Sequence, residues 1–99
     1  MSMNENAYQA KLIKKLEKKY PNAIILKNDA SYLQGIPDLT ILEGDRWAAL
    51  ETKKDNKASK RPNQDYYVNQ MDSMSFARFI RPENEEEVLN DLEKALHKK

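Results

Sequence analysis

The chain of 99 residues contains no cysteine and a single histidine, His97, close to a lysine-rich end. Without cysteine there is no disulfide and no thiolate zinc site, and one histidine in a tail excludes a histidine-based metal site or catalytic triad. A signal peptide and a bilayer-spanning apolar run are also lacking. These absences predict a soluble, cytoplasmic protein without membrane contact, and we expect His97 to be an ordinary tail residue.

Glycine and proline are scarce, and each falls between segments of regular hydrophobic pattern. No linker or internal repeat interrupts the chain, so we interpret residues 1–99 as a single domain. The spacing of apolar residues predicts amphipathic helices and short apolar strands. In chain order we expect a helix over 5–20, a strand over 23–26, hairpin strands near 36–43 and 46–53, a helix over 62–74, a strand over 76–80 and a helix opening at Pro82.

This α-β-β-β-α-β-α order predicts an α/β fold in which helices flank a single mixed β-sheet. The strand, helix and strand that end the order imply a right-handed crossover and one parallel strand pair. Both faces of the hairpin carry apolar residues, which indicates a central position in the sheet. We expect Leu42 and Trp47 to form a cross-strand pair in the core, and one of Tyr66 and Tyr67 to be buried.

Two acids, Asp38 and Glu51, lie at equal distances from the hairpin turn at residues 44–45. A tight two-residue turn places them opposite each other on adjacent strands. Directly opposed side chains have Cβ atoms roughly 4.5–5.5 Å apart, so the two carboxylates repel each other unless a cation lies between them. A divalent metal ion is the natural candidate. Lys53 lies on the same strand face as Glu51.

Acid-x-Lys triplets occur three times in the chain, and their contexts differ. The triplet that starts at Glu17 falls on an exposed helix face, and the one at Asp55 falls in a polar loop. Only Glu51-Thr52-Lys53 ends an apolar strand. Because an acid on such a strand lowers stability, it usually has a functional reason. Two acids and a lysine at one strand end predict metal-dependent phosphodiester chemistry.

The segment Pro37-Asp38 followed by Glu51-Thr52-Lys53, in this element order, resembles the PD-(D/E)xK nuclease superfamily. The approach Gly35-Ile36-Pro37-Asp38, an acid at Glu5 before Tyr8-Gln9, and Gln64 after a basic loop are similar to its VRR-Nuc branch. The resemblance covers residues 5–90 and extends to small phage proteins described as Holliday-junction resolvase-like nucleases. It implies a restriction-endonuclease-like fold over the chain.

The resemblance also implies a ligand set for Mg²⁺ or Mn²⁺. Asp38, Glu51 and the backbone carbonyl of Thr52 would bind the ion, because hard oxygen ligands suit these metals. Glu5 would complete the metal shell, directly or through water. Alternatively, Glu5 is a plain acid that serves the helix dipole, and Gln9 is the competing candidate on the same helix.

For the reaction, the resemblance implies in-line hydrolysis by activated water, with one or two metal ions and no covalent intermediate. Lys53 would lie beside the attacking water, and Gln64 would hydrogen-bond the substrate phosphate or that water. A cluster of basic residues would bind flanking phosphates without base readout; it comprises Lys54, Lys57, Lys60 and Arg61. Of these, we expect Lys60 to be the best placed.

Three functions remain open from the sequence. The first is a structure-specific endonuclease on branched DNA such as a Holliday junction, in a phage or its bacterial host cell. Symmetric cutting of a four-way junction needs two active sites, so this function predicts a homodimer. The second is a general or restriction-like nuclease on duplex or single-stranded DNA. The third is a non-catalytic module that binds nucleic acid through its lysines, which leaves the opposed acids unexplained.

Overall fold

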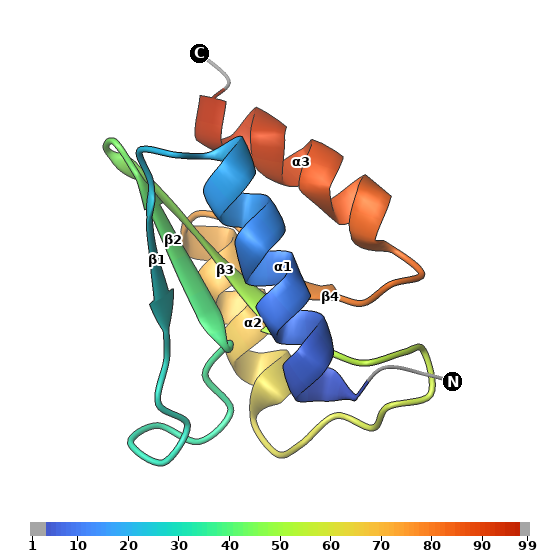
Figure 1. The fold of residues 1–99 in the computed structure, drawn as a ribbon. Coiled ribbons are helices and arrows are strands. Elements are labelled where there is room, and N and C mark those ends of the chain that lie inside the picture. The colour runs from blue at the N-terminus through green and yellow to red at the C-terminus, as the bar shows by residue number, and fades with distance from the viewer. Residues whose placement is uncertain (1–3, 98–99) are drawn as a thin grey trace.

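Helices and strands follow one another in the predicted order in the computed structural model, which describes residues 4–97. The strands form one mixed sheet in the order β1-β2-β3-β4, with helices on both faces (Figure 1). Within residues 4–97 no helix combines the length and apolar character needed to cross a membrane. The elements are α1 (Glu5–Lys19), β1 (Ile24–Lys27), β2 (Leu39–Glu43), β3 (Arg46–Thr52), α2 (Gln64–Met74), β4 (Ala77–Ile80) and α3 (Glu85–His97).

The strand pairing confirms the predicted hairpin and the predicted parallel pair. β1, β2 and β3 pair antiparallel, whereas β3 and β4 pair parallel. In the hairpin Leu39 lies opposite Leu50 and Glu43 lies opposite Arg46, which is the predicted register. Strand β2 begins at Leu39 rather than near residue 36, because the preceding Pro37 has no N–H to contribute to a ladder.

The main core lies between the sheet and the helices α1 and α3. A smaller apolar cluster lies under α2, where Val68 packs against Ala49 of β3 and Ala77 of β4. The main cluster is formed by Leu12, Leu16, Tyr20, Leu39, Ile41, Ala48, Leu50, Phe76, Ile80, Val88, Leu92 and Leu96.

The prediction that Leu42 and Trp47 lie in the core is wrong. Leu42 is 37% exposed, and Trp47 is only partly buried at the edge of the cluster under α2. The reason is that α2 packs on β3 and β4, so the same face of the sheet is open over β1 and β2. Tyr66 is exposed and Tyr67 is half-buried, so neither is fully buried.

Two helices begin later than their prolines predicted. Helix α2 begins at Gln64, after Asn63, whose φ of 70° is left-handed. Helix α3 begins at Glu85 rather than at Pro82. There the Asn84 carbonyl accepts the N–H of Val88 at 3.0 Å, while the Asn84 side chain accepts the N–H of Arg81 at 2.8 Å. The Asn84 N–H also donates to the Arg81 carbonyl at 3.1 Å, so residues 81–84 form a hydrogen-bonded turn that contains Pro82 and leads into α3.

Two tyrosines of α1 attach this helix to α3. The Tyr8 hydroxyl donates to Glu85 at 2.8 Å, and the Tyr20 hydroxyl donates to Glu93 at 2.9 Å. Burial raises the pKa of both phenols well above the ordinary value, and the hydrogen bonds to glutamates act in the same direction. The two contacts join α1 to α3 near the start of α1 and directly after its end, and Figure 1 shows both helices on the same face of the sheet.

His97 is not an ordinary tail residue, which corrects the prediction from sequence. Its Nε2 lies 2.7 Å from Glu43 and its Nδ1 lies 2.8 Å from Glu93, so the ring connects α3 to the hairpin. Hydrogen bonds to Glu43 and then Glu93 raise the pKa of His97 above its usual value.

Because the folded-state pKa of His97 is raised, its stabilising contribution is fully present below the ordinary pKa near 6.5 and is lost as pH rises through the folded-state value. We therefore expect the thermal midpoint of His97→Gln to lie below that of the wild type at pH 5.5, with the gap closing at pH 8.5. Thermal unfolding across pH measures it. If the difference in thermal midpoint between the two proteins is the same at pH 5.5 and pH 8.5, the charged contact of His97 with Glu43 and Glu93 does not stabilise the fold.

Candidate active site

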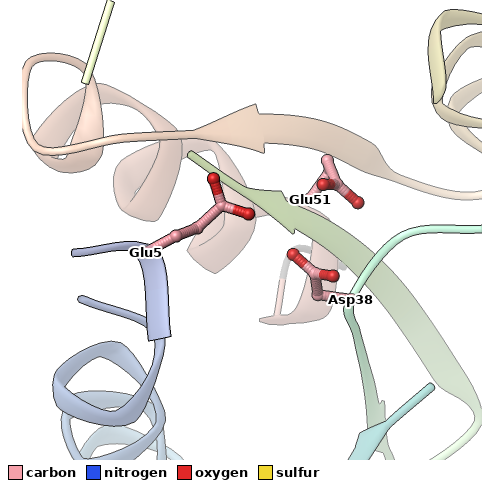
Figure 2. Close-up of side chains that lie close together, drawn as sticks. All are labelled: Glu5, Asp38 and Glu51. Atoms are coloured by element: carbon pink, nitrogen blue, oxygen red, sulfur yellow. The ribbon is translucent and has the colours of Figure 1, made fainter. Parts of the chain in front are cut away.

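Three carboxylates from three separate elements come together at one end of the sheet. Glu5 lies in the first turn of α1, Asp38 directly precedes β2, and Glu51 is the penultimate residue of β3. One oxygen from each lies within 4.8 Å of the others, and Figure 2 shows the three groups side by side. The predicted association of Asp38 with Glu51 is therefore present, and Glu5 joins it.

Asp38 is held in place by Thr52. Its Oδ2 accepts the Thr52 backbone N–H at 3.0 Å and the Thr52 hydroxyl at 2.6 Å. The Thr52 hydroxyl in turn accepts a hydrogen bond from Gln9 Nε2 at 3.1 Å. Gln9 thus positions Asp38 through Thr52, a role that the sequence interpretation missed. Strand alternation places Thr52 on the opposite face of the strand from Glu51, but no local pattern identifies Gln9 as its partner.

The backbone carbonyl of Thr52 also fits the predicted ligand set. In an extended strand the N–H and C=O of one residue point to the same side. Because the Thr52 N–H donates to Asp38, the Thr52 carbonyl lies on the side of β3 that faces this acid. The Thr52 carbonyl therefore adds a hard oxygen to those of the three carboxylates, Glu5, Asp38 and Glu51.

Glu51 is buried, at 1% exposure, and only one of its oxygens is satisfied. Oε2 accepts a hydrogen bond from Gln64 Nε2 at 2.8 Å and lies 3.8 Å from the Lys53 ammonium. Oε1 is buried and has no hydrogen-bond partner among the described residues. Burial, followed by repulsion from Asp38, raises the pKa of Glu51 to about 8.

This electrostatic environment suits a divalent cation. A buried carboxylate oxygen without a partner is costly, and the neighbouring Glu5 and Asp38 add negative charge to the same space. The donors are carboxylate oxygens, which Mg²⁺ and Mn²⁺ prefer. The residues present therefore fit the predicted metal.

Lys53 and Gln64 form a buried network on the other side of Glu51. The Lys53 ammonium donates to Gln64 Oε1 at 2.7 Å and to the Ser59 carbonyl at 3.1 Å. Gln64 Oε1 also accepts the Arg61 N–H at 2.8 Å. The Gln64 amide thus connects Glu51 to Lys53, a structural contact that the sequence did not predict. Lys53 is only 1% exposed, so its charge acts on the acids across a dry environment.

The acids lie where two hollows in the surface meet. The larger hollow, of about 940 Å³, is lined by Lys53, Lys54 and Lys57, and the smaller one has about 440 Å³. Glu5, Asp38 and Arg61 border both.

Most of the predicted basic cluster therefore lines the site, with one exception. Lys60, which we expected to be the best placed residue, contacts Asp65 at 2.9 Å and lies 4.5 Å from the centroid of the Phe79 ring. Its ammonium is engaged there, whereas Lys54, Lys57 and Arg61 border the larger hollow.

Gly35 brings the loop between β1 and β2 against the start of α2. A Cβ at this position would lie 2.6 Å from Asn63 Cβ, and the φ of Gly35 is +94°. We expect Gly35→Ala to lower the free energy of unfolding by about 2–4 kcal/mol, from overlap added to left-handed strain. Chemical denaturation measures this loss.

Gly44→Ala is the matched control for Gly35→Ala. Gly44 has a φ of +62°, but a Cβ there meets nothing within 4 Å. It should therefore lose only about 1–2 kcal/mol through backbone strain. Equal losses in the two variants would show that the contact with Asn63 is unimportant.

Comparisons of the chain with protein-family models, with curated proteins and with solved structures gave no match. The interpretation of the site therefore depends on its own residues: three clustered carboxylates, a buried lysine and amide behind them, and basic side chains around the hollow.

Proposed function

We propose that the chain is a metal-dependent endonuclease that hydrolyses DNA phosphodiester bonds. The observation that carries this proposal is the buried Oε1 of Glu51, which has no hydrogen-bond partner among residues 4–97 and lies within a cluster of three carboxylates beside a buried lysine. A cation that enters the cluster would offset its negative charge and give the Oε1 atom a partner. The proposal includes a restriction-endonuclease-like fold of the PD-(D/E)xK superfamily, VRR-Nuc branch.

Asp38, Glu51 and the Thr52 carbonyl would hold Mg²⁺ or Mn²⁺, with Glu5 completing the shell. The ion supplies Lewis-acid charge and lowers the pKa of water near the phosphate. The chain contributes preorganisation: Thr52 fixes Asp38, and Gln64 fixes Glu51. Lys53 supplies positive charge where negative charge grows on the phosphate oxygens. Because its ammonium is already held by Gln64 and Ser59, little reorganisation is needed.

The basic rim favours a polyanionic substrate. Lys54, Lys57 and Arg61 border the larger hollow, and cations arranged in this way bind phosphates in a salt-dependent manner without reading bases. We propose branched DNA, such as a Holliday junction, as the substrate. A homodimer would then supply the two sites that symmetric cutting needs. Phage or bacterial DNA as substrate implies a cytoplasmic enzyme.

The testing experiment is cleavage of three labelled substrates: a four-way junction, a linear duplex of matched sequence, and single-stranded DNA. Each is incubated with Mg²⁺, Mn²⁺ or EDTA, using the wild type and Lys53→Ala. Metal-dependent cutting of the junction alone, lost in the variant, supports the proposal in full. Cutting of all three substrates would support a nuclease that acts on DNA in general and would contradict the preference for a junction. Binding without cutting under every metal overturns the enzyme and leaves a DNA-binding module.

A further inference from the structure

The loop of residues 28–38, between β1 and β2, forms one wall of the proposed active site. Ala30, Ser31 and Gln34 line the smaller hollow together with Asp38 and Glu51. In Figure 1 the loop extends past the end of the sheet, near the start of α2. Whatever lies in this hollow against the acids therefore also meets the loop.

The base of this loop is fixed. The Asn28 side chain donates to the Pro37 carbonyl and to the Thr40 hydroxyl, each at 2.8 Å. The Asn28 N–H donates to the Asp38 carbonyl at 2.8 Å, which closes the two ends of the loop on each other. Gly35 adds the contact with Asn63, which directly precedes Gln64. The position of the loop is therefore fixed relative to the residues that surround Glu51.

The tip of the loop is held by two turns and carries two uncovered apolar side chains. The Tyr32 N–H donates to the Asp29 carbonyl, and the Ile36 N–H donates to the Leu33 carbonyl, both at 3.2 Å. Tyr32 is 89% exposed and Leu33 is 37% exposed. A single exposed apolar residue is ordinary. Two adjacent exposed apolar residues on a fixed loop that borders an acid cluster are a stronger indication of a binding surface.

From this arrangement we infer that Tyr32 and Leu33 contact unstacked bases next to the phosphate that is cut. An aromatic ring stacks on any base, and apolar side chains insert between bases where a helix is already interrupted. In continuous B-DNA the bases are stacked on each other, and their faces are closed to the loop. This inference rests on the proposed nuclease function and gives it a substrate class: DNA with unpaired or unstacked bases at the cut.

The proximity in the chain supports this assignment. Tyr32 directly follows Ser31, which lines the hollow, and consecutive Cα atoms lie ~3.8 Å apart. DNA rises ~3.4 Å per base along each strand. A strand whose phosphate lies at the acids therefore also passes the loop that carries Tyr32. Arg61, which lines the same hollow, carries the positive charge that the backbone of that strand requires.

The test compares Tyr32→Ala and Leu33→Ala with the wild type on two DNAs of equal length. One contains a four-way branch with unpaired bases at its centre, and the other is a continuous duplex with the same sequence at the cut. Tyr66→Ala is the matched control, since Tyr66 is a 59% exposed tyrosine on α2. Tyr32→Trp keeps a stacking ring. Because Tyr32 is exposed, its variants should fold, and far-ultraviolet circular dichroism checks this.

We expect Tyr32→Ala to lower kcat/KM on the branched DNA by roughly 5- to 100-fold and to leave any cutting of the continuous duplex at its wild-type rate. Tyr32→Trp should restore the branched rate, and Tyr66→Ala should match the wild type. If Tyr32→Ala and Leu33→Ala cut both DNAs at wild-type rates, this inference fails while the nuclease function stands. If the wild type cuts neither DNA, the proposed function fails, and the inference fails with it.

Discussion

Asp38→Asn is expected to reduce the rate of DNA cleavage by about 10³-fold, because it removes a carboxylate ligand and the several kcal/mol of charge stabilisation that a bound metal provides. The asparagine side chain can still accept the Thr52 N–H and hydroxyl that Asp38 accepts now. The fold should therefore be kept, and the loss should come from charge and metal affinity. Single-turnover cleavage with saturating enzyme measures it.

Asp45→Asn is the control for Asp38→Asn. Asp45 is an exposed acid at the hairpin turn, at the opposite end of β2, and its replacement changes the net charge by the same amount. We expect it to cut at the wild-type rate. Titration calorimetry with Mn²⁺ should show binding by Asp45→Asn and strongly weakened binding by Asp38→Asn. If the cleavage rate of Asp38→Asn lies within tenfold of the wild-type rate, the carboxylate cluster is not needed for the reaction.

Glu51→Gln is expected to make the metal-free protein more stable. The pKa of Glu51 is raised to about 8 in the folded state, whereas an unfolded glutamate titrates near 4.3. The ionised group therefore destabilises the fold, and stability is lost as pH rises from about 4.5 to about 8. A glutamine carries no charge and can still accept the Gln64 amide. At pH 8.5 the gain should be roughly 2–5 kcal/mol in the free energy of unfolding.

Metal should reverse the order of the two proteins. Mg²⁺ or Mn²⁺ stabilises whichever folded state binds it, so millimolar Mn²⁺ should raise the thermal midpoint of the wild type at pH 8.5 and leave that of Glu51→Gln nearly unchanged. Glu17→Gln, a change at an exposed helix position, should follow the wild type throughout. If the stability of the wild type and of Glu51→Gln changes with pH in the same way, the pKa of Glu51 is not raised by its surroundings.

The hairpin, and with it the pairing of the two strand-end acids, could be predicted because local chemistry determines both. Gly44 permits the tight turn, and the turn sets the register that places Leu39 opposite Leu50. The element order followed from hydrophobic period alone. The boundaries followed less well, since the segment that contains Pro82 forms a turn before α3 rather than its first residues.

Other features of the site depend on contacts between distant parts of the chain. The bond from Gln9 to Thr52 joins residues 43 positions apart, and no local pattern indicates it. The burial of Lys53 depends on how the loop at Ser59 and the helix at Gln64 fold over it. The exposure of Leu42 has a similar cause, because its alternation pattern is that of a core strand and only the position of α2 leaves it uncovered.

The order of synthesis adds a constraint on the proposed site. Asp38, Glu51 and Thr52 are all translated before residue 53, and the hairpin can form soon afterwards. Glu5 lies on α1, which is attached to α3 through Tyr8–Glu85 and Tyr20–Glu93. The position of Glu5 therefore depends on contacts of α1 with α3 as well as on the bond from Gln9 to Thr52 of the hairpin. A chain without α3 would keep Asp38 and Glu51 aligned on the hairpin and would lose two of the contacts that hold the helix of Glu5 beside them.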